Sequence, residues 1–230
     1  MTPIRVALVI HFREDSSGSR TAAFEVTKKV MTTRYAFDDV LVVDSGHERY
    51  NRSASRNYGV RLAEERGADV VVVCDADSVC ESGPLKQAIE EAYDKSIFVF
   101  PFNEVWYLVP KATQRIAVTP IAQLRNRAIH RTGPSNGGIW VCRPDVWWKV
   151  GGQDERLVGY GAEDRSMLAA TKTLLGESLT LEGILLCAYH DRELDTHESW
   201  DYDDVQLLER YHHAFGNREA TQAIIDEWRR

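Results

Sequence analysis

The chain has 230 residues, of which 43% are hydrophobic and 27% charged, a composition typical of a soluble globular protein. It has no apolar run near the ~20 residues of a membrane span, and its first ten residues lack the features of a signal peptide. The net charge of −7 argues against strong binding of nucleic acid through phosphate contacts.

Strand and helix patterns alternate along the first hundred residues. Short runs rich in β-branched residues predict strands at 4–10, 40–43 and 70–74. Apolar positions at helical spacing predict helices at 21–33 and 53–66. This alternation is typical of βαβ units, so we expect an α/β fold with a mostly parallel central sheet flanked by helices.

Polar residues follow each of these predicted strands. His11 and Arg13 follow the first strand, Asp44 follows the second, and Asp75 and Asp77 follow the third. Ligands of such sheets bind at the carboxyl ends of the strands. We therefore expect these side chains to meet at one edge of the sheet and to form a binding site there.

The acid pair comes directly after four valines, in the run ADVVVVCDADS. Side chains alternate along an extended strand, so Asp75 and Asp77 are expected to lean to the same side. Two carboxylates there suit a hard divalent cation such as Mg²⁺ or Mn²⁺, which in turn would hold a diphosphate. The alternative is a solvated turn that carries a helix cap.

The second half of the chain continues the α/β pattern, although residues 102–137 give no clear signal. The pattern predicts strands at 97–100, 139–142 and 184–189, and helices at 84–93, 144–150, 164–173, 205–215 and 220–228.

The segment NGGIWVCRPDVWWKVGGQDERLVGYGAEDRSM (136–167) contains an ordered series of motifs. A glycine pair precedes a strand and a short helix, and Gly-Gly-x-Asp-Glu and Gly-aromatic-Gly-x-Glu-Asp follow. This series resembles the acceptor-side motif of nucleotide-sugar glycosyltransferases with the A-type (GT-A) fold, in the galactosyltransferase and polypeptide N-acetylgalactosaminyltransferase group. Tyr160 stands where that group usually has Trp, and Ala162 where it usually has Gly. HFRED (11–15), and SASRNYG ahead of the DxD strand, resemble the same group.

The resemblance covers about residues 4–190 and implies one Rossmann-like GT-A domain over 1–230. Residues 1–100 would form the nucleotide-binding half, 101–190 the acceptor and catalytic half, and 191–230 closing helices. The implied activity is metal-dependent transfer of a sugar from a nucleotide-diphosphate sugar, most simply a UDP-sugar. The acceptor would be a hydroxyl on a glycan, a protein or a modified nucleobase. The chain looks like a bacterial or bacteriophage version of the group.

The resemblance also implies a metal site. Asp77 would bind Mn²⁺ (or Mg²⁺) directly, and His190 would be the third protein ligand. Asp75 is also a candidate metal residue and would contact the sugar or ribose, directly or through water. Imidazole is a softer ligand than carboxylate, which favours Mn²⁺. The alternative for His190 is an ordinary surface or core histidine.

Glu163 and Asp164 are implied to act on the acceptor. Asp164 would be the base of an inverting transfer and Glu163 a ligand of the acceptor hydroxyl. The alternative is that the two acids only complement the dipole at the N-terminus of a helix. In retaining relatives the equivalent acid does not act as a base, so the sequence leaves the stereochemistry open.

The remaining candidates concern the donor. His11 lies in the segment that resembles the family's nucleotide contact, Arg13 is expected at the base or phosphates, and Asp44 at the uracil or ribose. Arg56 is a candidate for phosphate, with a solvated helix charge as the alternative. Gly138 would let the backbone approach the donor sugar, with an ordinary turn as the alternative.

Two other functions remain open. A nucleotidyltransferase of similar fold would normally have a glycine-rich loop with Arg and Lys near the first strand, and SSGSR (16–20) is a poor version of it. A non-catalytic nucleotide-sugar-binding module is the other. The four cysteines lack CxxC spacing, which favours a reducing, cytoplasmic location.

Overall fold

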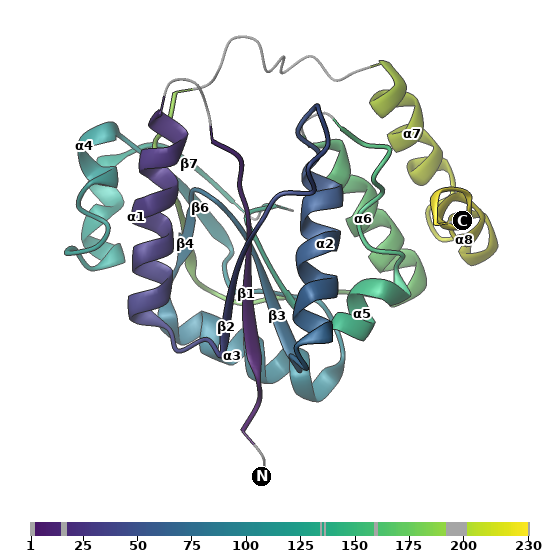
Figure 1. Cartoon of the computed structure of the whole chain (residues 1–230), viewed down its shortest axis with the longest axis horizontal. Helices are drawn as coiled ribbons and strands as arrows, with labels where there is room; N and C mark the ends of the chain where they lie inside the picture. The colour runs from purple at the N-terminus through teal and green to yellow at the C-terminus, as the bar shows by residue number, and fades with distance from the viewer. Residues whose placement is uncertain are drawn as a thin grey trace.

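The computed structural model describes residues 3–14, 18–133, 135, 137–158, 161–191 and 202–229 (Figure 1). In this part of the chain, one sheet has six strands in the order β2-β1-β3-β8-β5-β9 and another has four in the order β4-β10-β6-β7. The strands are β1 (Val6–His11), β2 (Asp39–Val43), β3 (Val70–Asp75), β4 (Ser78–Cys80), β5 (Val99–Phe100), β6 (Glu104–Leu108), β7 (Ala128–Thr132), β8 (Ile139–Cys142), β9 (Leu179–Thr180) and β10 (Ile184–Cys187).

The six-stranded sheet is mostly parallel, which confirms the prediction. Strand β1 pairs in parallel with β2 and β3, and β5 pairs in parallel with β9. Only β8 among these described strands runs against its neighbours, since it is antiparallel to both β3 and β5. The carboxyl ends of β1, β2 and β3 therefore lie at one edge of the sheet.

The predicted helices all occur, with ends that differ by a few residues. They are α1 (Ser19–Arg34), α2 (Arg52–Glu65), α3 (Ser82–Lys95), α5 (Pro144–Lys149), α6 (Ala162–Leu174), α7 (Tyr202–His213) and α8 (Arg218–Trp228). Two further helices were not predicted, namely α4 (Pro110–Thr113) and the 3₁₀ helix η1 (Ile121–Arg127). Figure 1 shows α1 on one side of β1 and β2 and α2 on the other side, with α5 to α8 beyond α2.

The region without a clear sequence signal forms β6, α4, η1 and β7. Strand β6 pairs with β10, which is about 80 residues later, and with β7. The apolar segment NEVWYLVP (103–110) suggested a possible strand, and β6 lies within it, whereas no local pattern indicated β7, which depends on its pairing with β6.

One hydrophobic core runs through the described chain from Val6 to Ile225. Val70–Cys74 are at most 1% exposed, as expected for a strand buried on both faces. Gly59 of α2 lies so close to β1 that a Cβ atom there would overlap Val9. All four cysteines are buried and free. No described helix has the length and apolar character that a membrane crossing requires.

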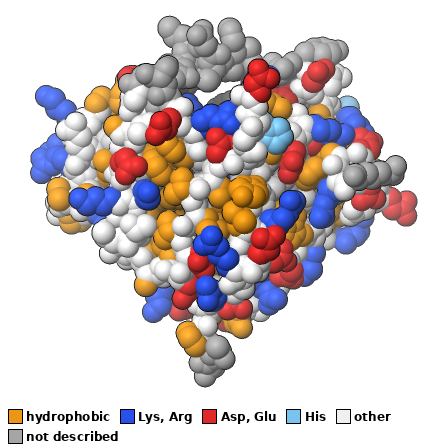
Figure 2. All heavy atoms as spheres, viewed as in Figure 1, with side chains coloured by type: hydrophobic (Ala, Val, Ile, Leu, Met, Phe, Trp, Pro, Cys, Tyr) orange, Lys and Arg blue, Asp and Glu red, His pale blue; other side chains and the backbone are white. Residues whose placement is uncertain are grey.

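The face that carries α1, β2 and α2 has interspersed acidic and basic side chains (Figure 2). Hydrophobic side chains gather near its centre. Strand β2 is at the edge of its sheet, and its Val40 and Val42 are 38% and 42% exposed.

Candidate active site

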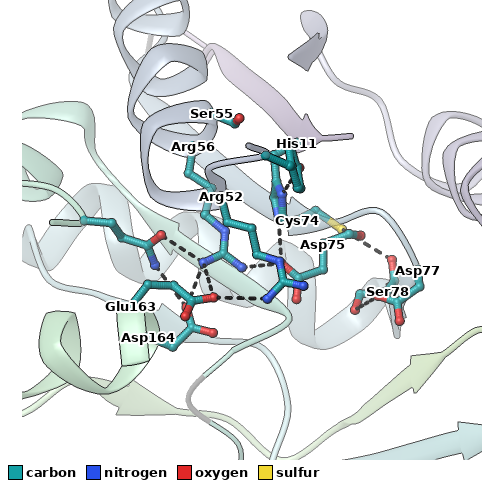
Figure 3. A network of polar contacts seen from close by, with 12 residues as sticks. His11, Arg52, Ser55, Arg56, Cys74, Asp75, Asp77, Ser78, Glu163 and Asp164 are labelled. Atoms are coloured by element: carbon teal, nitrogen blue, oxygen red, sulfur yellow. Dashed lines mark hydrogen bonds and ion pairs between the residues drawn. The ribbon is translucent and has the colours of Figure 1, made fainter. Parts of the chain in front are cut away.

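The carboxyl edge of the six-stranded sheet brings the predicted polar residues together (Figure 3). His11 at the end of β1 lies 2.8 Å from the carboxylate of Asp75 at the end of β3. Arg13 and Asp44, which follow β1 and β2, form a bidentate ion pair. The convergence expected from the parallel topology is therefore present.

Asp75 lies between two buried nitrogen donors. Its Oδ1 accepts hydrogen bonds from His11 Nε2 at 2.8 Å and Arg56 Nη2 at 2.6 Å. Its backbone N–H donates to the carbonyl of Gly138 at 2.8 Å, which fixes the end of β3. Burial by itself would raise the pKa of Asp75, but the Arg56 charge and the His11 hydrogen bond outweigh it and hold that pKa below its usual value.

His11 acts as a neutral donor to Asp75. Burial lowers its pKa, and the charge of Arg56 adds to that effect. The carboxylate only accepts hydrogen bonds, so Nε2 carries the proton and Nδ1 accepts from the Tyr50 hydroxyl at 2.7 Å. Tyr50, directly before α2, is thus joined through His11 to the first acid of the DxD.

Asp77 points to a different set of partners. It accepts a hydrogen bond from Ser78 Oγ at 3.2 Å, and its Oδ2 lies 3.6 Å from Nε2 of His190. The nearby carboxylate of Asp77 raises the pKa of His190. Both side chains are partly exposed, at 26% and 21%. His190, 113 positions later in the chain, is therefore next to Asp77 as predicted.

The expectation that both acids lean to the same side assumes an extended strand, and the strand does not reach Asp77. Strand β3 ends at Asp75 and a turn follows, so the alternation of an extended strand does not continue to Asp77. The predicted metal residues thus form an Asp77–His190 pair, with Asp75 directed toward Arg56. Within the described ranges, no group of three His, Cys, Asp or Glu side chains is arranged to hold an ion.

Asp164 lies in the first turn of α6, where the helix dipole favours negative charge. Its Oδ1 accepts hydrogen bonds from Arg56 Nη1 at 2.9 Å and Gln153 Nε2 at 3.0 Å. Burial raises the pKa of Asp164 to about 7, against the effect of Arg56 and with help from the negative charges of Glu163 and Asp75. A carboxyl with that pKa can exchange a proton near neutral pH.

Glu163 is buried beside two arginines. Its Oε1 lies 3.7 Å from Arg52 and 3.9 Å from Arg56. Its Oε2 is buried and has no hydrogen-bond partner among the residues that the structure describes. A buried oxygen of this kind can accept a hydrogen bond from a bound hydroxyl.

Arg13 binds the carboxylate of Asp44 and also the backbone of the loop that follows β2. It donates to the carbonyls of His47 and Glu48 at 2.7 and 3.1 Å, and its guanidinium lies 5.2 Å from the centre of the Tyr50 ring. A cavity of about 330 Å³ opens beside Asp44, between this loop and the exposed face of α2.

Two glycines form a close contact with the site. A Cβ atom at Gly137 would overlap Oδ2 of Asp164, and one at Gly138 would overlap Leu185 of β10. Gly138 also has φ +98°, a value that favours glycine. Packing of the chain itself therefore requires small residues at both positions.

The structure adds two residues that the sequence reasoning did not single out. Gln153 contacts both Arg56 and Asp164, and Tyr50 contacts His11. Gln153 stands inside the Gly-Gly-x-Asp-Glu motif, which was the available signal for it, whereas nothing local marked Tyr50. Parts of the motifs lie outside the described residues, namely Asp15, Asn136 and the Gly159-Tyr160 pair.

Solved structures share this architecture at low sequence identity. The catalytic domain of Drosophila β1,4-galactosyltransferase 7 in complex with xylobiose matches with a TM-score of 0.56 and 16% identity, over 92% of this chain and 82% of that one. A mutant of the same enzyme in complex with manganese, UDP-Gal and xylobiose matches with the same TM-score and identity, over 88% and 79%. GalNAc-T7 with UDP, GalNAc and Mn²⁺ matches with a TM-score of 0.52 and 14% identity, over 96% of this chain and 52% of that one. No family model matches the sequence, and no curated protein matches it either.

The fold is therefore that of the A-type glycosyltransferases. It is a Rossmann-like α/β fold with a mostly parallel sheet, and the sequence resemblance to the galactosyltransferase and polypeptide N-acetylgalactosaminyltransferase group is confirmed for the fold.

Proposed function

We propose that this chain is a metal-dependent glycosyltransferase that moves a sugar from a UDP-sugar to a hydroxyl acceptor. The observation that carries the proposal is one cluster at the carboxyl edge of an A-type sheet. There Asp77 pairs with His190, and Asp75 lies two positions before Asp77 in the chain. Arg56 donates hydrogen bonds to both Asp75 and Asp164 and so links them.

Asp77 and His190 suit a divalent cation. One carboxylate and one imidazole, both partly exposed and 3.6 Å apart, are a donor pair that accepts Mn²⁺ or Mg²⁺. Water and a diphosphate would complete the coordination, since Asp75 is engaged by His11 and Arg56. The bound cation would stabilise the departing diphosphate. Mn²⁺ is named in two of the similar structures, which supports this choice.

The residues around His11, Arg13 and Asp44 are the proposed site for the nucleotide. Arg13 and Asp44 hold each other at the ends of β1 and β2, beside an open cavity. UDP-Gal and UDP are named with the similar proteins, and UDP-sugar is therefore the donor that we propose. Gly138, next to Asp75, is proposed to line the donor sugar.

Asp164 is the proposed base of an inverting transfer. Its raised pKa suits proton removal from an acceptor hydroxyl near neutral pH. The unpaired, buried Oε2 of Glu163 is proposed to accept a hydrogen bond from that acceptor. The acceptor belongs to a glycan, a protein or a modified base, and xylobiose in two of the similar structures makes a glycan the first to test.

We also propose that residues 1–230 form a single transferase domain in a cytoplasmic protein of bacterial or bacteriophage origin. The continuous core and four free, buried cysteines are consistent with these expectations.

A thermal-shift panel tests the donor and the cation together. Purified protein and Asp77→Ala are melted with nucleotide sugars in Mn²⁺, Mg²⁺ or EDTA. A donor at about 100 times its Kd should raise the Tm of the wild type by about 5 °C or more, only with the cation and only with Asp77 present. No shift with any donor would contradict the proposal.

Product analysis then separates the other functions. Release of UDP with sugar on the acceptor supports a glycosyltransferase. Release of pyrophosphate would identify a nucleotidyltransferase, and donor binding without turnover on any acceptor, water included, would identify a binding module.

A further inference from the structure

Arg56 is the most enclosed charged side chain of the site. It lies one turn into α2 and is 1% exposed. Its Nη2 donates to Asp75 at 2.6 Å, and its Nη1 donates to Asp164 and to Gln153 Oε1, each at 2.9 Å. One guanidinium therefore joins the first acid of the DxD to the first turn of α6 (Figure 3).

These contacts leave Arg56 little freedom to serve another ligand. If the side chain turned toward a phosphate, Asp75 and Asp164, whose side chains are 30% and 15% exposed, would lose their shared cation. Removing one partner from an ion pair that is largely shielded from water is destabilising. Arg56 is thus better suited to hold protein groups than to contact the donor.

The contacts of Asp164 are divided between its two oxygens. Arg56 and Gln153 both donate to Oδ1, so this oxygen is held from two sides. The other oxygen, Oδ2, faces Gly137, where a Cβ atom would overlap it. The hydrogen bonds therefore fix the rotation of the carboxylate and direct Oδ2 toward the glycine pair.

We infer that Arg56 is a positioning residue, which holds Asp164 with Oδ2 directed toward the glycine pair instead of binding the donor phosphates itself. The inference rests on the proposed function, in which Asp164 takes the proton of the acceptor hydroxyl. The guanidinium geometry is essential, because two separate nitrogens reach two carboxylates that come from residues 89 positions apart in the chain.

Arg56→Lys tests this directly. Lysine keeps the positive charge and is itself able to bind phosphate, but its single nitrogen cannot contact both carboxylates at once. Turnover is followed with the donor and acceptor found above, and the affinity for UDP with Mn²⁺ is measured by calorimetry. We expect kcat to fall by about 100-fold, as when a general base is misplaced, while the Kd for UDP changes by less than about threefold. Arg66→Lys, at the end of the same helix with a side chain that is 52% exposed, is the matched control and should leave both values unchanged.

A crystal structure of Arg56→Lys provides a readout that does not depend on turnover. We expect the Asp164 carboxylate to rotate away from its position between residue 56 and Gln153. If the wild type transferred no sugar, the proposed function would fail, yet this rotation would still support the positioning role.

Two results would overturn the inference. One is weaker UDP binding with kcat unchanged, which would make Arg56 a donor ligand. The other is an unmoved Asp164 with kcat unchanged. If Arg56→Lys does not fold, the double variant Arg56→Lys/Asp75→Asn removes the charge of Asp75 that the lysine would leave without a partner. The same displacement of Asp164 is then expected, and an unmoved Asp164 would overturn the inference.

Discussion

Arg56 donates a hydrogen bond to Asp164 across 2.9 Å, although the two residues are 108 positions apart in the chain. The same guanidinium binds Asp75, so the acid that ends β3 and the acid that opens α6 share one buried cation. This relationship connects the donor side of the proposed site with the acceptor side, and several of its consequences are measurable.

Replacement of Asp77 should remove metal-dependent binding of UDP. Asp77→Ala deletes the carboxylate that lies beside His190, and we expect the affinity for UDP in Mn²⁺ to fall by about 10-fold or more. Asp94→Ala, an exposed acid of α3, is the control. Calorimetry with Mn²⁺ and with EDTA gives the comparison, and equal affinities in the two media for the wild type would speak against the metal site.

Asp164→Asn should abolish transfer and leave UDP binding intact. The amide fills the same space but cannot take a proton, and loss of a general base costs about 10²–10⁴-fold in rate. Steady-state kinetics and UDP calorimetry on the same preparation check this expectation. Turnover within about threefold of the wild type would exclude Asp164 as the base.

Wild-type turnover should rise as pH increases through about 7. Burial, together with the negative charges of Glu163 and Asp75, raises the pKa of Asp164 to about 7, and a base acts only when ionised. The measurement is kcat between pH 5 and 9 with saturating donor and Mn²⁺. A rate that is constant over this range would contradict the assignment.

A rise in pH should also reduce the contribution of the Asp164 carboxyl to the free energy of unfolding, although it increases turnover. Its pKa is higher in the folded chain than the ordinary value of 3.8, so its contribution to stability is complete below that value and is lost as pH rises through about 7. Between pH 5 and 8, the free energy of unfolding should therefore decrease more for the wild type than for Asp164→Asn. Urea unfolding of both proteins at both pH values tests this, and an equal change in the two would refute it.

The glycine pair should respond unequally to alanine. Gly138→Ala combines a left-handed φ with overlap of Leu185, and we expect a loss of about 1–3 kcal/mol in the free energy of unfolding. Gly137 has no left-handed φ, and a Cβ atom there would overlap only the carboxylate of Asp164, so Gly137→Ala should cost less stability and, by displacing that carboxylate, more turnover. Urea unfolding and kcat for both variants give the comparison. The reverse order of stability would contradict the packing described for Gly138.

Tyr211 should stabilise the contact between α7 and the loop before α6. Its hydroxyl donates to the buried Asp154 at 3.0 Å, so Tyr211→Phe should cost about 1 kcal/mol in the free energy of unfolding. Tyr58→Phe, at a side chain that is 43% exposed, should stay within about 0.5 kcal/mol of the wild type. Urea unfolding measures both, and equal effects would rule out a specific role for the hydrogen bond to Asp154.

Local patterns in the sequence determined most of the fold. The apolar spacing predicted the helices and the main strands, and the parallel order followed from their alternation. The polar residues at the ends of β1, β2 and β3 were correctly expected at one edge, because parallel strands end on the same side of a sheet. The motifs in 136–167 further indicated the A-type fold.

Only the tertiary structure decided how the side chains pair. Arg56 looked like a phosphate ligand or a solvated helix charge, and its burial follows from Gln153 and Asp164, about 100 positions away. Asp75 and Asp77 were expected on one side of the strand end, and the turn after β3 gives them different partners. Strands β6 and β7 likewise depend on β10 and on each other. Periodicity reports which face of an element is buried, whereas the partner of a polar side chain depends on chain segments far away in the sequence.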